Sequence, residues 1–466
     1  MASFLSLLVL HSHRESLPPN HNLPIIPLML SKEAKLLQLW RAKTNKLFLL
    51  GILILAIWSL LSFLRAGQLM ATPDYGGVDF HAYWYAGLFV RQRQDPYIAF
   101  FAEMDVASPV NFLDEPAPQT VEVPLGFSIV PANTAPIVLL ITPLAWFSWP
   151  TAKTIWLIIN IILVLLLPWL AFRALPDARH LPWTDKLLTA LAFYAMTGTR
   201  RALDTGQTTL LVLTLMVGTL LLARKNWLIA GIMLGIALSK YSVALPLFLF
   251  FIYKRHFRLI VTSLIVQLGG ILSIAVIATT SPLSILDSYL RLLLQHLGGK
   301  GIHLGQLFPS GSPWRWIVPA LGTLLLLAWV RQVLWVKQGR SRLPNDNSSD
   351  TFNDWHIITI LSLWTLLVAY HRLYDIVLVL FFFVLIVTGL RWPAAWRSSR
   401  RENLFLSLLA IGIISVLILP GDTVMALIAP QAATAWANLL LYSQISALLC
   451  ALLLSVYLWL YCLNRA

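Results

Sequence analysis

The sequence has little charge and almost no cysteine. Only 12% of its 466 residues are charged, against about 25% in an ordinary soluble domain, while 58% are hydrophobic. This composition excludes a soluble globular protein, because most of the apolar surface must face lipid. The two cysteines, Cys450 and Cys462, both lie in the last apolar run, which excludes a disulfide framework and a cysteine-based metal site.

Acidic residues and the short motifs of common soluble enzymes are also scarce. The 34 Lys and Arg residues outnumber the 20 Asp and Glu residues, which gives a net charge of +14. The basic residues form short clusters between apolar runs, a pattern that orients membrane helices rather than binding nucleic acid. We find no GxSxG motif, P-loop or strand-to-helix GxGxxG, and no histidine or acidic pattern with metal-ligand spacing. We therefore expect an integral membrane protein without a nucleic-acid partner, a metal or another cofactor.

Long apolar runs predict an all-α polytopic membrane protein. A helix needs about 20 apolar residues to cross a bilayer. We expect about twelve transmembrane helices, one or two of them partial, from these runs: 47–64, 129–147, 154–172, 187–198, 207–223, 227–253, 259–279, 316–336, 355–370, 376–390, 404–420 and 437–461. Run 227–253 contains Lys240, whose charge at the bilayer centre costs about 2.5–3.5 kcal/mol. We therefore expect a hairpin of two short helices with Lys240 at its tip.

The charge distribution predicts the orientation and the domain limits. Basic clusters favour the cytosolic side, and they stand at 32–46, 254–258, 337–342 and 391–401. The loop 66–128 holds eight acidic residues and two arginines, so it is expected outside. We interpret residues 1–45 as a cytosolic leader rather than a cleaved signal peptide, and 46–466 as one membrane domain. Within that domain, 339–354 is expected to be a cytosolic polar linker.

Polar residues gather on the predicted external side. They occupy five segments, around Asp79 and at 200–207, 240–241, 281–315 and 370–375. An ionisable group next to lipid is costly unless it lies in a cavity or at an interface. Transporters place such groups near the bilayer midplane, often in two related halves. The one-sided distribution here predicts a site at the edge of the membrane.

Asp79 is the first candidate catalytic residue. It begins a segment with helical apolar spacing and many aromatic side chains, which predicts a helix lying in the membrane interface. A carboxylate at that position can accept a proton from an acceptor hydroxyl group. The alternative is that Asp79 only caps the helix by accepting from its first amides.

Basic side chains are the candidate partners of Asp79. Lys240 and Arg372 can bind a phosphate leaving group, the first as a point charge and the second as a fork. Alternatively, Lys240 extends to the interface and Arg372 pairs with Asp375. His371 can orient an acceptor or contact phosphate, or it is a hydrogen-bonded histidine at the rim. Gln207 begins a helix whose free amides favour an anion.

These motifs, in their order, resemble the polytopic glycosyltransferases of the GT-C superfamily. The resemblance is greatest to glycosyltransferase family 87, the polyprenol-phosphate-mannose-dependent mannosyltransferases, over roughly residues 45 to 390. It rests on these segments: Asp79-Phe80 with Tyr83 and Ala86, Asp95-Pro96-Tyr97, Pro131 to Pro143-Leu144, Trp156 to Asn160, Gly206-Gln207, and Ala230 to Gly235 leading to Lys240. Before His371 the sequence departs from the family pattern Ser-Pro-x-x-Trp-x-His, because Leu366 to Tyr370 stand there.

The resemblance implies a GT-C-type bundle and an inverting transfer of a mannose-like hexose. The donor would be a polyprenyl-phosphate sugar, and the acceptor a lipid or glycan at the external or periplasmic face of the cell membrane. Asp79 would be the general base and His371 the important histidine of a later external loop. We also expect side chains that bind substrate or the donor phosphate, namely Tyr83, Arg201, Gln207, Lys240 and Arg372. The alternatives are a lipid-linked oligosaccharide ligase or polymerase, a lipid or glycolipid transporter, and a structural membrane protein.

Overall fold

The computed structural model describes residues 29–72, 76–98, 131–175, 177–296, 304–308, 312–324, 326, 328, 347–368, 372–391, 400–418 and 433–465. Every regular element in these residues is an α-helix or a 3-10 helix, as predicted. The elements are α2 (Met29–Ala71), α3 (Val78–Arg91), α5 (Ala135–Ile141), η2 (Thr142–Trp146), α6 (Trp149–Ala174), η3 (Asp177–His180), α7 (Trp183–Ala195), α8 (Thr197–Asp204), α9 (Thr209–Leu222), α10 (Trp227–Ala237), η4 (Leu238–Lys240), α11 (Tyr241–Tyr253), α12 (Phe257–Ile277), α13 (Pro282–His296), η5 (Leu304–Leu307), α15 (Asn347–Val368), η6 (Leu373–Val379), α16 (Leu380–Arg391), α18 (Arg400–Ile418) and α20 (Ala433–Arg465).

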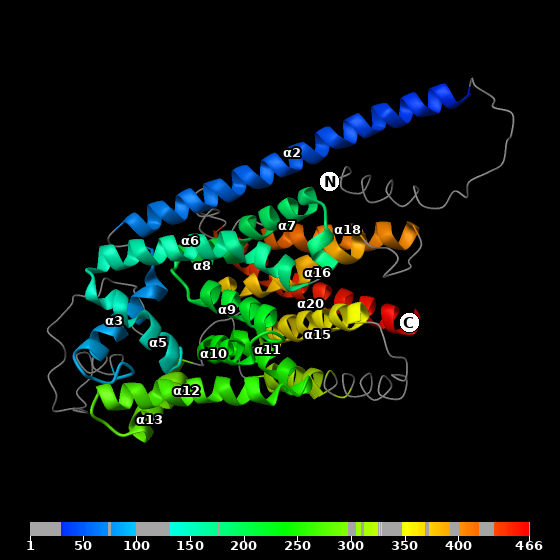
Figure 1. Cartoon of the computed structure of the whole chain (residues 1–466). Coiled ribbons are helices and arrows are strands. Elements are labelled where there is room, and N and C mark those ends of the chain that lie inside the picture. Colours follow the sequence, from blue (N-terminus) through cyan, green and yellow to red (C-terminus); the bar gives the residue numbers. More distant parts are fainter. Residues whose placement is uncertain are drawn as a thin grey trace.

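The long helices lie lengthwise beside one another (Figure 1). α3, α5 and α13 gather at one end of the molecule, and the C-terminal end of α20 lies at the opposite end. The first helix of the described residues, α2, is continuous across residue 45, where the sequence predicts the boundary of a leader. Residues 1–28, and residues 73–75 and 99–128 of the predicted external loop, lie outside the described residues.

Among the described residues, six helices are long and apolar enough to cross a membrane. They are Leu49–Ala71, Trp149–Ala174, Trp227–Tyr253, Phe257–Ile277, Leu373–Leu390 and Leu439–Leu460. A seventh arises if the bent pair α8 and α9 is one span. The predicted count of about twelve is therefore not confirmed, and the predicted run 316–336 falls largely outside the described residues.

The run 129–147 does not form one long helix. Its described part folds as α5 followed directly by η2, and Pro143 stands in the first turn of η2. Proline has no backbone N–H, so it interrupts the regular α-helical hydrogen bonds. The sequence predicts one or two partial helices but not which runs form them, and this run is one of them.

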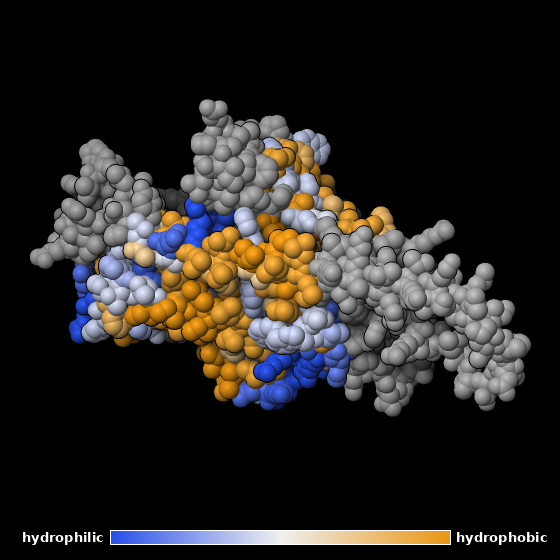
Figure 2. All heavy atoms as spheres, turned by 90° about the horizontal axis from the view of Figure 1, so that it is seen from above, coloured by the Kyte–Doolittle hydropathy of each residue, from blue (hydrophilic) through white to orange (hydrophobic). Residues whose placement is uncertain are grey.

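Apolar side chains cover the outside of the bundle. Exposed leucine and isoleucine residues stand on α2, α6 and α12, for example Leu64, Ile162 and Ile265. Figure 2 shows a hydrophobic region across the middle of the molecule with hydrophilic residues at its borders. An apolar surface of this kind fits lipid as the solvent. Together with the six apolar helices, it indicates an integral membrane protein.

The chain reverses its direction at Lys240. Gly231 and Gly235 of α10 pack against Thr262 and Val266 of α12, so the two helices run parallel. A straight helix of the 27 residues Trp227–Tyr253 would be about 40 Å long and would carry its end far from the start of α12. The chain therefore turns between α10 and α11, where Lys240 has φ −108° and ψ 71°. This is the hairpin that an ionisable residue in the middle of an apolar run predicts. Trp227–Tyr253 therefore counts among the six apolar helices by length and composition only, because it does not run straight.

Candidate active site

A break between two helices forms the floor of the candidate site. α8 and α9 meet at an angle of 118°, and Gly206 between them has a φ of +67°. A Cβ atom at this position would lie 2.7 Å from Cβ of Phe80. The indole N–H of Trp156 donates to the carbonyl oxygen of Gly206 at 2.7 Å. Glycine is needed here because other residues rarely adopt this backbone conformation.

The first turn of α3 rests on the last turn of α8. The backbone amides of Asp79 and Phe80 donate to the carbonyl oxygen of Thr205 at 3.0 and 3.2 Å. Gly77 is the N-cap of α3, and no side chain caps the helix. The alternative that Asp79 serves as the N-cap is therefore wrong, because backbone carbonyls already satisfy these amides. The predicted helix itself is confirmed, but most of its side chains are buried in the protein, so an interfacial position is not confirmed.

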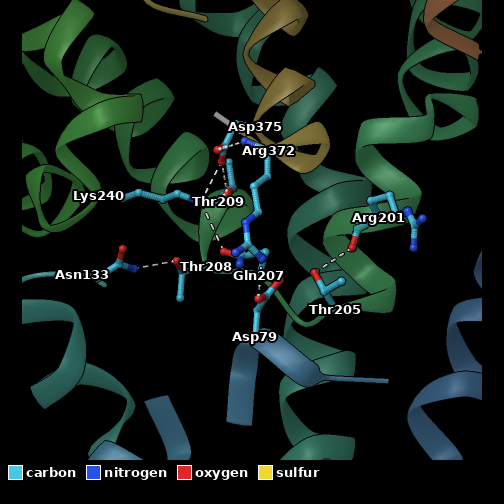
Figure 3. Close-up of polar contacts among 10 residues, drawn as sticks. All are labelled: Asp79, Asn133, Arg201, Thr205, Gln207, Thr208, Thr209, Lys240, Arg372 and Asp375. Carbon is cyan, nitrogen blue, oxygen red and sulfur yellow. Dashed lines mark hydrogen bonds and ion pairs between the residues drawn. The ribbon is translucent and has the colours of Figure 1, made fainter. Parts of the chain in front are cut away.

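Arg372 is the cationic neighbour of Asp79. One of its terminal guanidinium nitrogens lies 3.7 Å from Oδ1 of Asp79, and their side chains are 42% and 10% exposed. Figure 3 shows the Arg372 side chain extending from the Asp375 side of the cluster to Asp79. Asp375 accepts from the backbone amide of Arg372 at 3.3 Å. A loose contact with a half-exposed guanidinium leaves this charge accessible from outside the protein.

Lys240 is buried among acceptors. Its Nζ lies 2.7 Å from Oδ1 of Asp375 and 3.2 Å from Oε1 of Gln207, and it also donates to the Thr209 hydroxyl. The ring of Tyr374 lies 4.6 Å from the same nitrogen. Because an ammonium group has three N–H donors, these contacts engage all of them. Lys240 is thus not a lysine that extends to water, and its nearest anion, Asp375, escaped the sequence analysis as a site residue.

Tyr83, four residues after Asp79 on α3, is bonded to a second group of polar residues. Its hydroxyl forms a hydrogen bond with Thr208, and Nδ2 of Asn133 donates to the Thr208 hydroxyl at 2.8 Å. Burial, together with the negative charge of Asp79, raises the pKa of Tyr83 well above its ordinary value. Tyr83 is therefore a neutral phenol at physiological pH. Asn133 and Thr208 were missed by the sequence analysis, although both are polar residues next to a helix break.

The site lies inside the bundle, about halfway along α12, and not at the end of the helices. Gln267 stands in the middle of α12 and its side-chain amide donates to the carbonyl oxygen of Gly235 and to the Ser239 hydroxyl. The tip of the hairpin is therefore level with the middle of α12. α3, α5 and α13 cover this end of the molecule (Figure 1). The position differs from the predicted rim, because short helices end at the site while α12 continues past it.

One predicted residue does not join this cluster, and the structure does not describe another. The guanidinium of Arg201 points away from Asp79 (Figure 3), and its backbone carbonyl accepts from the Thr205 hydroxyl at 2.9 Å. His371 lies outside the described residues. In the described part of the chain, no group of three or more His, Cys, Asp or Glu residues is arranged to hold a metal ion.

The fold and the polar cluster define a class, an all-helical integral membrane protein with a buried charged site. The model described as glycosyltransferase family 87 matches residues 133–345, which is a little under half of the chain. This part of the chain is similar to that family, as the sequence motifs predict, and the match supports an enzyme of the glycosyltransferase type. Gln207 and Lys240 lie within the matched residues, whereas Asp79 and Arg372 lie outside them. No curated protein matches the chain.

Proposed function

We propose that this membrane glycosyltransferase transfers a mannose-like hexose from a polyprenyl-phosphate donor to a lipid or glycan acceptor. The observation that carries the proposal is the contact between Asp79 and Arg372, which places a base and a phosphate-binding cation 3.7 Å apart. A donor with a lipid tail suits a protein with such a large apolar surface, since the donor can enter from the bilayer. The reaction takes place at the external face of the cell membrane, with inversion.

The charge pattern supports this sidedness. α9 begins at the site and contains 14 residues, so it is about 21 Å long. Arg224 and Lys225 follow its far end, and basic residues favour the cytosolic surface. The site then lies about two thirds of the way across a hydrocarbon core of about 30 Å. A sugar phosphate can reach this depth from the external side while its lipid tail stays in the bilayer.

The proposed reaction is a single displacement. The acceptor hydroxyl oxygen attacks the anomeric carbon while Asp79 accepts its proton. The bond between the anomeric carbon and the phosphate oxygen breaks, and the leaving polyprenyl phosphate keeps the electron pair. Arg372, whose side chain is 42% exposed beside Asp79, stabilises this phosphate. Attack opposite to the leaving group inverts the configuration at the anomeric carbon.

Lys240 acts in this proposal as a positioning residue. Its donors are engaged, so it does not replace Arg372 at the phosphate. It holds Asp375, whose second carboxylate oxygen accepts from the Arg372 amide. Gln207 fixes the ammonium group from the α9 side. We keep His371 as the residue that orients the acceptor, on the strength of the resemblance, and leave Arg201 out of the reaction because its side chain points away.

The decisive experiment compares wild type with Asp79→Asn in proteoliposomes that contain a panel of polyprenyl-phosphate hexoses and membrane-derived acceptors. Loss of the base should lower turnover by at least about 100-fold. Asp287→Asn is the matched control, because Asp287 is exposed on α13 in a pair with Arg291. Full turnover by Asp79→Asn would exclude Asp79 as the base. Movement of a labelled lipid without transfer of its sugar would favour the transporter.

A further inference from the structure

Tyr289 carries a buried hydroxyl group that no protein group satisfies. Its side chain, on α13, is 8% exposed, and among the described residues its hydroxyl oxygen has no hydrogen-bond partner. Buried polar groups in folded proteins are almost always hydrogen-bonded, because leaving one unpaired is costly. The phenol is both a donor and an acceptor, so this position offers two unused hydrogen-bonding functions.

This hydroxyl belongs to the α13 side of the candidate active site. The rings of Tyr289 and Tyr97 lie 5.2 Å apart, and the Tyr97 hydroxyl donates to the carbonyl oxygen of Asn133 at 3.3 Å. Asn133 in turn donates to the Thr208 hydroxyl, which forms a hydrogen bond with Tyr83, and Tyr289 also acts electrostatically on Tyr83. Contacts through Tyr97, Asn133 and Thr208 therefore connect Tyr289 to Tyr83, which stands four residues after Asp79 on α3.

The position of Tyr289 is fixed by its neighbours. The Ser288 hydroxyl, one residue earlier, forms a hydrogen bond with the Asp95 carboxylate, which also accepts from the backbone amide of Tyr97 at 2.9 Å. Ile285 and Leu292, on the same face of α13, are buried in one cluster with Tyr97. The unpaired hydroxyl is thus held in place by packing and by an anchored neighbour, which is the arrangement that lowers the cost of binding a ligand.

We propose that Tyr289 binds a hydroxyl group of a sugar, either the hexose of the donor or a carbohydrate acceptor. The inference rests on the proposed function and names the part of the substrate that this side of the site receives. The charged groups that act on these tyrosines are all carboxylates, namely Asp79 and Asp375 on Tyr83 and Asp95 on Tyr97. A neutral polyhydroxyl group therefore fits the tyrosine side better than a phosphate, for which Arg372 is the proposed partner. Neutral phenols and flat aromatic rings suit such a ligand.

Tyr289→Phe removes only the oxygen and is the test variant. The full chain in nanodiscs is titrated with polyprenyl phosphate and with a polyprenyl-phosphate hexose that wild type uses. If the ligand is the donor sugar, the variant should bind the hexose-bearing lipid about tenfold more weakly and the sugar-free lipid equally. A donor that lacks the one hydroxyl group bound by Tyr289 should then bind wild type about tenfold more weakly than the complete donor. The variant should bind these two donors equally. If the ligand is the acceptor, donor affinity stays and the acceptor KM rises about tenfold.

Two controls separate this inference from the proposed function. Tyr442→Phe, at an exposed position on α20, should change neither affinity nor KM. Tyr289→Phe should unfold at the same temperature as wild type or higher, because no protein hydrogen bond is lost; a lower temperature would overturn the inference. Unchanged donor affinity together with an unchanged acceptor KM would also overturn it. Failure of wild type to bind either lipid would instead overturn the proposed donor, and this inference with it.

Discussion

The buried pair of Lys240 and Asp375 gives the sharpest test of the site. The two charged atoms lie 2.7 Å apart, and the side chains are only 10% and 4% exposed. Removing one partner of such a pair leaves an uncompensated buried charge, which costs about 3–5 kcal/mol. Lys240→Met should therefore destabilise the protein by this amount. The variant also removes the hydrogen bonds to Gln207 and Thr209, so the upper half of the range is expected.

The double variant Lys240→Met with Asp375→Leu separates stability from function. Replacing both members of a buried pair by apolar side chains is often neutral or stabilising, so most of the lost stability should return. Transfer should not return, because the amide of Arg372 loses its acceptor and the guanidinium is no longer held beside Asp79. The expected pattern is thus a recovered free energy of unfolding with turnover still reduced at least tenfold.

The assay is denaturant unfolding in detergent, followed by tryptophan fluorescence, beside the proteoliposome transfer assay. Lys254→Met is the matched control, since Lys254 pairs with Asp354 at 2.8 Å but is 28% exposed and far from the site. Its loss should cost about 1 kcal/mol or less. The reasoning is refuted if Lys240→Met costs no more than this control, or if the double variant regains full transfer along with its stability.

Two further predictions concern the backbone and pH. Gly206→Ala should lower the unfolding temperature and reduce transfer, because the new Cβ meets Phe80 and the residue has a positive φ. Gly51→Ala is the control and should change neither, because there is open space around Gly51. Equal unfolding temperatures of the two variants would contradict this prediction. Burial raises the pKa of Asp95 to about 6, above its unfolded value of 3.8, so the folded protein binds the proton more tightly and stability falls as pH rises from about 4 to 6. Asp95→Asn should remove this fall in the free energy of unfolding, which amounts to at most about 3 kcal/mol. The measurement is denaturant unfolding of both proteins between about pH 4 and 6. The same dependence on pH in the variant and in wild type would disprove the prediction.

Part of the site was predictable because the signals are local. A lysine inside an apolar run is too costly to leave in lipid, and this alone predicts the turn at Lys240. Gly206 marks the break before α9 for a similar reason, since glycine is the residue that accepts a positive φ. Pro143 likewise indicates that the helix in run 129–147 is interrupted, whereas the apolar length of this run does not.

The pairing of the charges was not predictable from neighbours in the sequence. The spacing of Arg372 and Asp375 is typical of a local pair. In the structure, Asp375 pairs with Lys240, and the Arg372 guanidinium lies beside Asp79. Both contacts join residues from distant parts of the chain. The predicted polar segments therefore indicated the site, whereas its geometry depended on which helices pack together.

By itself, the sequence determined that the protein is helical and built for lipid, and that it carries the motifs of a glycosyltransferase. Apolar length, charge scarcity and short motifs are properties of contiguous residues, so they can be read without a fold. Only the tertiary structure decided that Asp79 does not cap its own helix and that Lys240 is enclosed by acceptors. It also decided that the buried Tyr289 hydroxyl has no hydrogen-bond partner among the described residues. Whether a buried polar group has a hydrogen-bond partner depends on which distant segments pack against it, so the sequence alone does not reveal it.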